Sequence, residues 1–323
     1  MQASNTALVL GVTGGIGGET ARQLAAAGWA VKAMSRRSGM VPENNHGITW
    51  LRGDAMNRHD VEIAAQGCEV IVHAVNPPGY KNWQTLVLPM LENTIAAAQK
   101  YGAMIVLPGT LYNYGPDAFP LLTEENSQNP LTRKGLIRRQ MEQRLRDFAD
   151  DGGRVLIVRA GDFFGPMAGH SWFSQGMVKG GRRVTSVVVP NLPGVGHQWA
   201  FLPDVARTMV QLLERRQQLD PFATFHMSGH WDDDGRQLAE AVCRVVKRHT
   251  GTAPKMTRFP WWLIRLLAPF QQTLREILEM RYLWRQPVRL SNQRLTALLG
   301  EEPHTPLDQA VEQTLRGLGC LKD

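Results

Sequence analysis

Five glycines within eight residues lie near the start of the chain and could bind a phosphate group. The run is Gly11-Val-Thr-Gly-Gly-Ile-Gly-Gly18. Glycines permit a tight turn, and they let backbone N–H groups approach a pyrophosphate at the positively polarised start of a helix. The candidate contacts are Gly11, Thr13, Gly14, Gly15, Ile16 and Gly17. A turn that only joins two packed elements is the alternative interpretation.

Such a turn indicates a nucleotide site only when a strand precedes it and a helix follows it. The apolar residues 7–10 predict a short buried strand. Residues 19–28 are alanine-rich and end in a glycine, which predicts a helix. Residues 29–34 predict a second strand and complete a strand–helix–strand unit. We therefore expect the glycine turn to bind a nucleotide.

Two arginines, Arg36 and Arg37, follow the second predicted strand. An NAD-binding protein normally carries an acidic residue at about this place, which accepts hydrogen bonds from the ribose hydroxyls. A guanidinium can instead bind a 2′-phosphate through two hydrogen bonds. The pattern favours NADP over NAD, and a solvated basic loop is the alternative.

The glycine spacing, with Thr13 just before the second glycine, resembles the fingerprint of extended and atypical short-chain dehydrogenase/reductases, the NAD(P)-dependent epimerase/dehydratase-like family. The resemblance covers nearly the whole chain and is strongest at residues 7–37 and 103–166. It implies a Rossmann-type domain that binds NAD(P), followed by a lobe that binds the substrate.

The resemblance implies further cofactor contacts after two later strands, predicted at residues 47–51 and 70–75. These contacts are Asp54, Ala55, His73, Ala74 and Val75. In the family a carboxylate at the place of Asp54 receives the adenine amino group, although an aspartate there could equally cap the next helix. His73 would lie along the ribose and phosphates, although a lone histidine is more often a buried core residue.

The segment after a predicted strand at residues 103–107 resembles the family's Ser/Thr-Ser/Thr-x-x-Val-Tyr-Gly active-site segment. It reads Pro108-Gly-Thr-Leu-Tyr-Asn-Tyr-Gly115. With Tyr114 aligned to the family tyrosine, Thr110 falls where the family places a catalytic Ser or Thr. The resemblance implies that Thr110 hydrogen-bonds the substrate oxygen during hydride transfer.

The family's acid–base pair, a Tyr four residues before a Lys, is missing from its expected place. Lys134, Arg138 and Glu142 keep the family spacing, so Lys134 replaces the Tyr and Arg138 replaces the Lys. The three residues share one face of a predicted helix. Arg138 could still bind the nicotinamide ribose, while Tyr112, Tyr114 or a desolvated Lys134 could supply a proton. A solvated helix without a catalytic role is the alternative.

Asp162 stands where relatives carry an asparagine that touches a nucleotide sugar. A carboxylate at that place would repel a sugar diphosphate, which makes such a substrate less favourable. The sequence predicts a small-molecule substrate with a carbonyl or hydroxyl group and leaves its identity open.

The composition is that of a globular protein, with 43% apolar and 20% charged residues among 323. The net charge of +7 suits anionic ligands, but the basic residues are dispersed and form no nucleic-acid motif. Three widely spaced cysteines and the absence of a signal pattern predict a cytoplasmic protein. The sequence shows no metal-ligand spacing and no apolar stretch near the roughly 20 residues that span a bilayer.

Alternating strands and helices predict an α/β fold with a Rossmann-type doubly wound parallel sheet. We expect an NAD(P)-binding domain at residues 1–165 and a smaller, mainly helical substrate lobe at 166–323. Residues 197–230 or so should return to the first domain. The Trp-rich residues 260–268 are too short to span a membrane, so they could pack against the lobe or a second subunit, or lie on a membrane surface.

Two functions from different classes follow. The first is an NADP-dependent oxidoreductase or epimerase/dehydratase-like enzyme with a non-standard active site. The second is a catalytically inactive protein that binds NADP and reports the redox state to a partner, which the missing Tyr–Lys pair suggests. Relatives often pair through the helices around residues 85–100 and 134–149, so the resemblance is also compatible with a homodimer.

Overall fold

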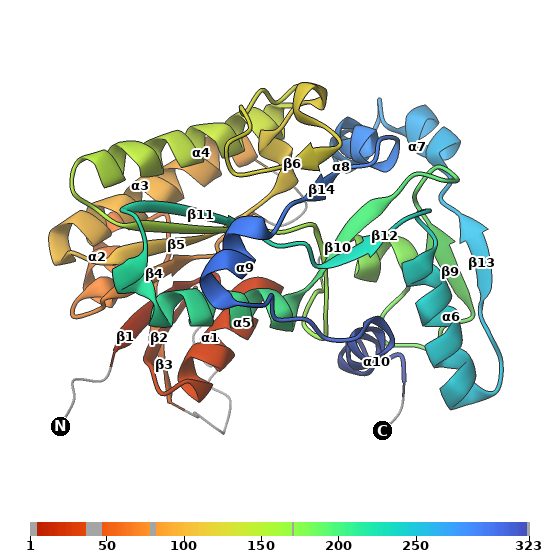
Figure 1. The fold of residues 1–323 in the computed structure, drawn as a ribbon, viewed down its shortest axis with the longest axis horizontal. Coiled ribbons are helices and arrows are strands. Elements are labelled where there is room, and N and C mark those ends of the chain that lie inside the picture. The colour runs from red at the N-terminus through yellow and green to blue at the C-terminus, as the bar shows by residue number, and fades with distance from the viewer. Residues whose placement is uncertain (1–4, 37–46, 78–81, 170, 322–323) are drawn as a thin grey trace.

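The protein is described by a computed structural model that covers residues 5–36, 47–77, 82–169 and 171–321. Seven parallel strands form its main sheet (Figure 1). Their spatial order is β3 (Ile48–Arg52), β2 (Ala30–Ser35), β1 (Thr6–Leu10), β4 (Val70–His73), β5 (Met104–Gly109), β7 (Val155–Arg159) and β11 (Phe222–His226). The strand order reverses between β1 and β4, and ligands of open parallel sheets bind beside the carboxyl ends of the strands at such a point.

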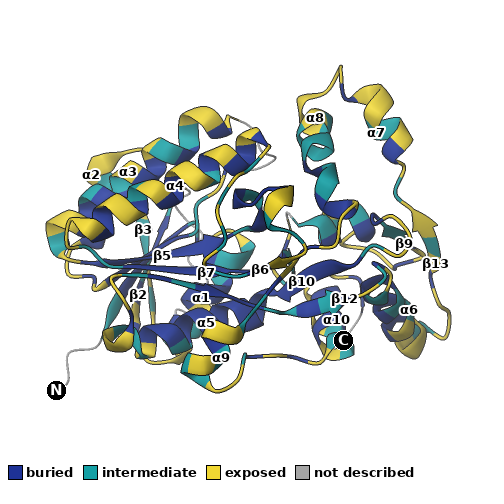
Figure 2. Cartoon of the chain, turned by 45° about the horizontal axis from the view of Figure 1, so that its top comes forward, coloured by how far each residue is buried: buried dark blue, intermediate teal, exposed yellow. Residues whose placement is uncertain are grey.

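Helices cover both faces of this sheet. One face carries α1 (Gly15–Ala26), α5 (Leu202–Glu214) and α9 (Gln293–Leu299), and the other carries α2 (Arg58–Ala65), α3 (Trp83–Tyr101) and α4 (Arg133–Asp150). The central strands are therefore buried on both sides, which Figure 2 shows as dark blue ribbons between helices with exposed outer faces. Burial on both faces explains why these strands are continuous apolar runs rather than alternating patterns.

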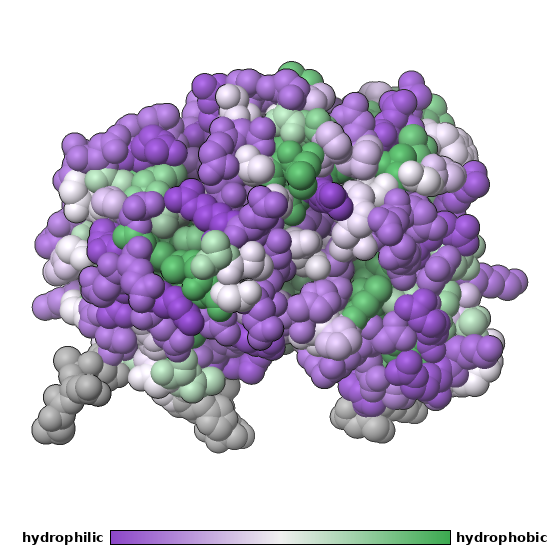
Figure 3. Space-filling view, in the orientation of Figure 1, coloured by the Kyte–Doolittle hydropathy of each residue, from purple (hydrophilic) through white to green (hydrophobic). Residues whose placement is uncertain are grey.

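The rest of the chain forms a second lobe around a separate apolar cluster. Its strands are β8 (Asp162–Phe164), β9 (Ser186–Val189), β10 (His197–Phe201), β12 (His230–Asp232) and β13 (Lys255–Arg258). Its helices are α6 (Gln237–Thr250), α7 (Trp261–Leu267), α8 (Gln272–Glu279) and α10 (Leu307–Gly317). The two-residue strands β6 (Leu121–Leu122) and β14 (Arg289–Leu290) pair with each other and join this lobe to the loops above the main sheet. Hydrophilic side chains cover most of the face seen in Figure 3.

The predicted α/β fold with a Rossmann-type parallel sheet is confirmed. Helix α1 begins at Gly15, four residues before the predicted start at residue 19, because the last glycines of the turn already have helical geometry. The second lobe contains strands as well as the expected helices. Strand β11 lies at the edge of the main sheet, and α5 packs against α1.

Candidate cofactor and substrate site

The glycine turn joins β1 to α1 at the reversal point of the sheet. Gly11 has a φ of +85°, and a Cβ atom there would lie 2.4 Å from the carbonyl oxygen of Ala74. A Cβ atom on Gly17 would lie 2.3 Å from the carbonyl oxygen of Gly11. Only glycine fits these two positions, because the opposing atoms belong to the backbone and the turn is packed against the end of β4.

Within the described chain no side chain caps the first turn of α1, whose N-cap residue is Gly14. The first N–H groups of a helix have no partner inside the helix, and together with the helix dipole they attract an anion. Thr13 and Gly14 are exposed, while Gly15 and Ile16 are half-buried. The turn therefore offers backbone donors to a phosphate on a surface that side chains leave open.

Arg36 is exposed at the carboxyl end of β2, and Arg37 lies outside the described residues. The half-buried Asp54 accepts a hydrogen bond from the backbone N–H of Met56 at 3.0 Å. The helix-cap alternative for Asp54 is wrong, because the N-cap of α2 is Asn57, whose Oδ1 accepts from the N–H of His59 at 3.0 Å. The carboxylate of Asp54 can thus still serve a ligand.

His73, at the end of β4, is 2% exposed. Its Nδ1 lies 2.8 Å from Oγ1 of Thr94, and that hydroxyl donates its own hydrogen to the carbonyl of Met90 at 3.1 Å. Nδ1 therefore carries the imidazole proton, and the buried Nε2 accepts no hydrogen bond from the described residues. Burial, with the charge of Arg138, lowers the pKa of His73 to about 3, so the ring is neutral.

The unpartnered Nε2 of His73 matters because buried polar atoms normally have a hydrogen-bond partner. His73 is the last residue of β4, and the half-buried Ala74 and Val75 follow it, with the backbone of Ala74 packed against the glycine turn. A ribose hydroxyl of a dinucleotide could donate to this nitrogen. The glycine turn and this acceptor together fit a nicotinamide dinucleotide.

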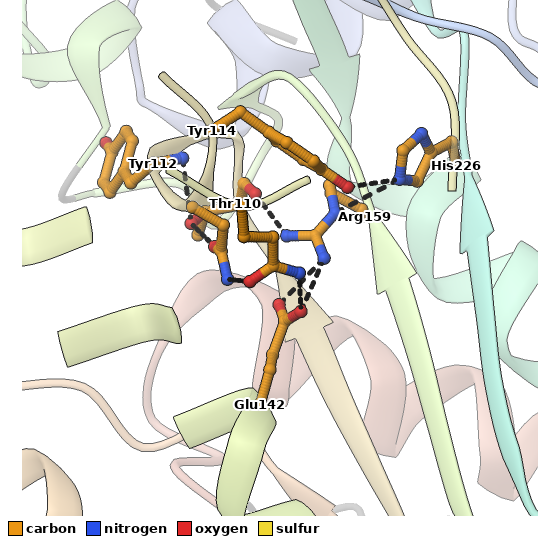
Figure 4. Close-up of polar contacts among 8 residues, drawn as sticks. Thr110, Tyr112, Tyr114, Glu142, Arg159 and His226 are labelled. Atoms are coloured by element: carbon orange, nitrogen blue, oxygen red, sulfur yellow. Dashed lines mark hydrogen bonds and ion pairs between the residues drawn. The ribbon is translucent and has the colours of Figure 1, made fainter. Parts of the chain in front are cut away.

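Thr110 is half-buried at the end of β5, where its Oγ1 lies 3.4 Å from the backbone nitrogen of Tyr112 and 3.4 Å from Oδ1 of Asn113. Tyr112 is half-buried, and its ring points away from the other labelled residues in Figure 4. Tyr114 is 1% exposed, and its hydroxyl lies 3.2 Å from Nε2 of His226. The two tyrosines of this loop therefore face opposite ways.

Lys134 is 2% exposed near the start of α4. Its ammonium forms ion pairs with two carboxylates of α8, those of Glu276 and Glu279, the latter at 2.7 Å. Burial would raise the pKa of Glu279, but the hydrogen bond and charge of Lys134 outweigh it and lower that pKa. Lys134 is thus a buried ion-pair centre that connects α4 to α8.

Arg138 lies one turn further along α4 and is half-buried. Its guanidinium lies over the ring of Trp83 at 5.2 Å. Because its charge also acts on His73, the structure brings Arg138, His73 and Trp83 together beside the end of β4. Lys134 instead turns toward the second lobe.

A buried polar network that the sequence analysis did not identify as a unit supports this loop (Figure 4). Arg159, fully buried at the end of β7, donates to both carboxylate oxygens of Glu142 at 2.8 Å and to the carbonyl of Thr110 at 2.5 Å. Its Nε donates to Nε2 of His226 at 3.2 Å. Arg159 therefore holds the backbone of Thr110, and Glu142 of α4 and His226 of β11 hold Arg159 in place.

The charges of this network are those of the ion pair between Arg159 and Glu142. Burial alone would lower the pKa of Arg159, but the Glu142 carboxylate beside it raises that pKa. Burial and then the charge of Arg159 lower the pKa of His226 to about 3, so His226 is neutral and accepts at Nε2. Burial raises the pKa of Tyr114, whose ring also lies 5.0 Å from the Arg159 guanidinium.

Tyr282 lies in the 3-10 turn Met280–Trp284 after α8. The sequence analysis did not single it out, because it belongs to no recognisable motif. Its ring stacks on Phe119 at 6.3 Å, and its buried hydroxyl has no partner among the described residues. Burial, then the charges of Glu279 and Asp162, raises its pKa. Oδ2 of Asp162 lies 2.8 Å from Nε2 of His197, within hydrogen-bond distance. The charges of Asp162 and of Glu279, a carboxylate that binds Lys134, therefore both act on Tyr282.

A protein-family model described as the NAD dependent epimerase/dehydratase family matches residues 7–227. The chain belongs to this family. No curated protein matches the sequence.

Several solved structures share the fold of this epimerase/dehydratase-family chain. MoeE5 in complex with UDP-glucose and NAD is 16% identical, with a TM-score of 0.71 and 98% of each chain covered. UDP-glucose 4-epimerase from Thermotoga maritima, with UDP-glucose, is 17% identical, with a TM-score of 0.72 and 97% and 98% covered. A monomeric L-threonine 3-dehydrogenase from a metagenome is 18% identical, with a TM-score of 0.73 and the same coverage. Nearly the whole chain therefore shares the fold of these structures.

Within the described ranges, this family member has no cluster of three or more His, Cys, Asp or Glu side chains that could hold a metal ion. In the same ranges, every helix is too short or too polar to cross a membrane.

Proposed function

We propose that the protein is an NADP(H)-dependent oxidoreductase that acts on a small carbonyl or hydroxyl compound. The observation that carries this proposal is the glycine turn, where Gly11 and Gly17 have no room for a side chain and the start of α1 has no side-chain cap in the described chain. The neutral His73, with its unpartnered Nε2, adds an acceptor at the end of β4, whose next residue, Ala74, packs against that turn. A bound nicotinamide ring supplies or accepts the hydride.

The choice of NADP over NAD rests on the residues after β2. Arg36 is exposed, and neither it nor its described neighbours Met34 and Ser35 is acidic. A guanidinium there can bind a 2′-phosphate, whereas NAD selection would need a carboxylate for the ribose hydroxyls.

Titration of NADPH and NADH into the cofactor-free protein tests this choice, with Arg36→Asp beside the wild type. We expect tight NADPH binding, weak NADH binding and a reversed preference in the variant. Lys247→Asp, which makes the same charge change on the exposed end of α6, is the matched control. If neither nucleotide binds, the glycine turn serves another anion and the enzyme proposal is wrong.

The residues around the end of β5 divide the chemical work in this proposal. Thr110, held by Arg159, positions the substrate oxygen, and Arg138 binds the nicotinamide ribose. Tyr282 donates a proton to the substrate oxygen as hydride reaches the carbon, since its ring stacks on Phe119 of the loop after β5 and its hydroxyl has no partner among the described residues. Lys134 and Tyr114 are tied to other partners and support the site, while Tyr112 is the alternative donor.

The substrate proposed here is smaller than a sugar nucleotide. MoeE5 and the Thermotoga maritima epimerase bind UDP-sugars, but Asp162 adds a carboxylate that disfavours a second anionic group nearby. The likeness to L-threonine 3-dehydrogenase indicates that this architecture also serves substrates without a nucleotide. A panel of aldehydes and ketones with NADPH, read by loss of absorbance, tests this class.

The second candidate is a protein that binds NADP(H) without turnover and transmits the redox state to a partner. The burial of Lys134 between Glu276 and Glu279 favours it, because the family's acid–base position is closed. Tight NADPH binding, no NADPH oxidation over the panel and a partner affinity that differs between NADPH and NADP would establish this function instead. Oxidation that Tyr282→Phe abolishes would exclude it.

A further inference from the structure

Exposed apolar side chains are concentrated on α7 and the turn to α8. Trp262, Leu266, Leu267 and Phe270 are 71%, 62%, 39% and 83% exposed. They are four of the eleven large exposed apolar side chains of the described chain, and they lie within nine residues. Trp262 and Leu266 are one helical turn apart and so share a face of α7. In Figure 2 the two helices project from the second lobe, and in Figure 3 apolar atoms lie over α7 beside hydrophilic ones.

The start of α7 is packed against the second lobe, so the exposure of the four apolar side chains is a property of the fold. Trp261 is buried, and its Nε1 donates to the carbonyl of Pro190 at 2.8 Å. Its ring lies 4.7 Å from that of Phe259 and 6.0 Å from that of Trp172. Consecutive residues of a helix point about 100° apart, so fixing Trp261 inward directs Trp262 outward.

The same surface is positively charged. Residues 255–285 contain six basic and two acidic side chains, a net charge of +4. Both acidic residues, Glu276 and Glu279, pair with Lys134 of α4. Burial, and then the like charges of Arg285 and Arg265, lower the pKa of Arg281.

None of Arg265, Arg281 and Arg285 forms an ion pair within the described part of the chain. The buried Nε of Arg281 has no hydrogen-bond partner there either. Clustered arginines without counter-charges are costly, and an external anion relieves their repulsion. Arg265 is exposed on α7 next to Leu266, and Arg281 lies over Trp261 at 5.4 Å, at the base of the same helix.

Two occupants could cover such a surface, and the charge distinguishes them. In a symmetric pair of copies the same patch faces itself, which would bring the arginines of one copy against those of the other. An anionic bilayer instead offers acyl chains for the apolar residues and phosphate groups for the arginines. Tryptophan is favoured at the boundary between the two.

We infer that the α7–α8 patch, formed by Trp262, Leu266, Leu267 and Phe270 with Arg265, Arg281 and Arg285, docks the protein peripherally on an anionic lipid surface. The apolar residues enter the headgroup boundary, and the arginines bind lipid phosphates. The inference concerns an additional interaction and does not depend on the proposed catalysis.

Sedimentation of the full-length protein with vesicles tests this inference, using pure phosphatidylcholine and a mixture that contains phosphatidylglycerol. We expect binding to the mixed vesicles alone, with a blue shift of tryptophan fluorescence. Arg265→Glu should weaken binding about 30-fold, roughly fivefold for each of the two charge units lost. The double variant Trp262→Ser and Phe270→Ser should abolish the binding and the blue shift.

Two matched control variants distinguish an effect of the patch from a general effect of losing surface charge or an exposed apolar side chain. Leu131→Ser removes a side chain that is 78% exposed on another part of the surface, and Lys247→Glu reverses an exposed charge at the end of α6. Both variants should bind vesicles like the wild type. Equal weakening by the controls, or the absence of any vesicle binding, would overturn the inference. A patch variant that converts a dimer to a monomer without affecting vesicle binding would show that the surface joins two copies.

Discussion

Replacing Glu142 with glutamine should destabilise the fold much more than the same change in an exposed ion pair. The Glu142 carboxylate binds a fully buried arginine through two hydrogen bonds of 2.8 Å and also accepts from Gln128 at 2.6 Å. Glu142→Gln keeps the size of the side chain and removes the charge. Arg159 would then remain as an uncompensated buried cation next to the neutral His226.

The expected size of the effect follows from the burial of the pair. Removing one partner of a buried ion pair costs about 3–5 kcal/mol, since the other charge stays desolvated. Because glutamine retains one acceptor oxygen, we expect a loss near the lower end, about 3 kcal/mol. Glu92→Gln breaks an ion pair with Arg144 in which the side chains are 52% and 37% exposed, and exposed pairs contribute about 0–1 kcal/mol.

Urea denaturation of both variants, followed by circular dichroism, measures the two free energies of unfolding. Arg159→Gln alone and the double variant Glu142→Gln with Arg159→Gln complete a mutant cycle, which should show a coupling energy above about 1 kcal/mol. If Glu142→Gln loses no more stability than Glu92→Gln, Arg159 does not depend on Glu142 for its charge balance. The account of the network given above would then be wrong.

Three further outcomes follow from the site. Gly17→Ala should abolish NADPH binding, because its Cβ would meet the Gly11 carbonyl, while calorimetry should find normal binding for Gly169→Ala, whose Cβ would meet no atom within 4 Å. The pKa of His73 is about 3 in the folded protein against an ordinary value near 6.5, so the unfolded chain takes up the proton first as the pH falls. The stability that neutral His73 contributes is therefore fully present above pH 6.5 and falls toward pH 3 by about 1.4 kcal/mol per pH unit. His73→Gln should reduce this slope of the unfolding free energy, measured by urea titration at a series of pH values. Tyr282→Phe should leave stability within about 1 kcal/mol, since its hydroxyl has no partner in the described chain, yet slow single-turnover NADPH oxidation at least about 100-fold; equal rates would exclude Tyr282 as the proton donor.

The strands of the main sheet and the helices between them could be predicted because their signals are local. Residues 7–10 form most of β1, and residues 29–34 nearly coincide with β2. The start of α1 was placed late because helix propensity disfavours glycine, whereas here Gly15 and Gly17 are tolerated for the room that the turn requires.

The partners of the site residues could not be predicted in this way. Lys134 binds carboxylates about 140 residues away in the chain, and the hydroxyl of Tyr114 meets a histidine 112 residues away. The resemblance predicts that Lys134 replaces the family tyrosine, but from the sequence its side chain could equally have faced solvent or a substrate. Only the position of α8 decided that it is buried.

By itself, then, the amino-acid sequence determined the glycine turn, the alternation of strands and helices, and the family to which these belong, because residues close in sequence specify them. The tertiary structure decided which polar groups are neutralised and which are left without a partner. Arg159 joins Glu142 and His226 only when β7, α4 and β11 assemble, and Lys134 joins Glu279 only when α8 of the second lobe packs against α4. Such contacts depend on how elements pack in space, and the spacing of residues along the chain carries no record of that.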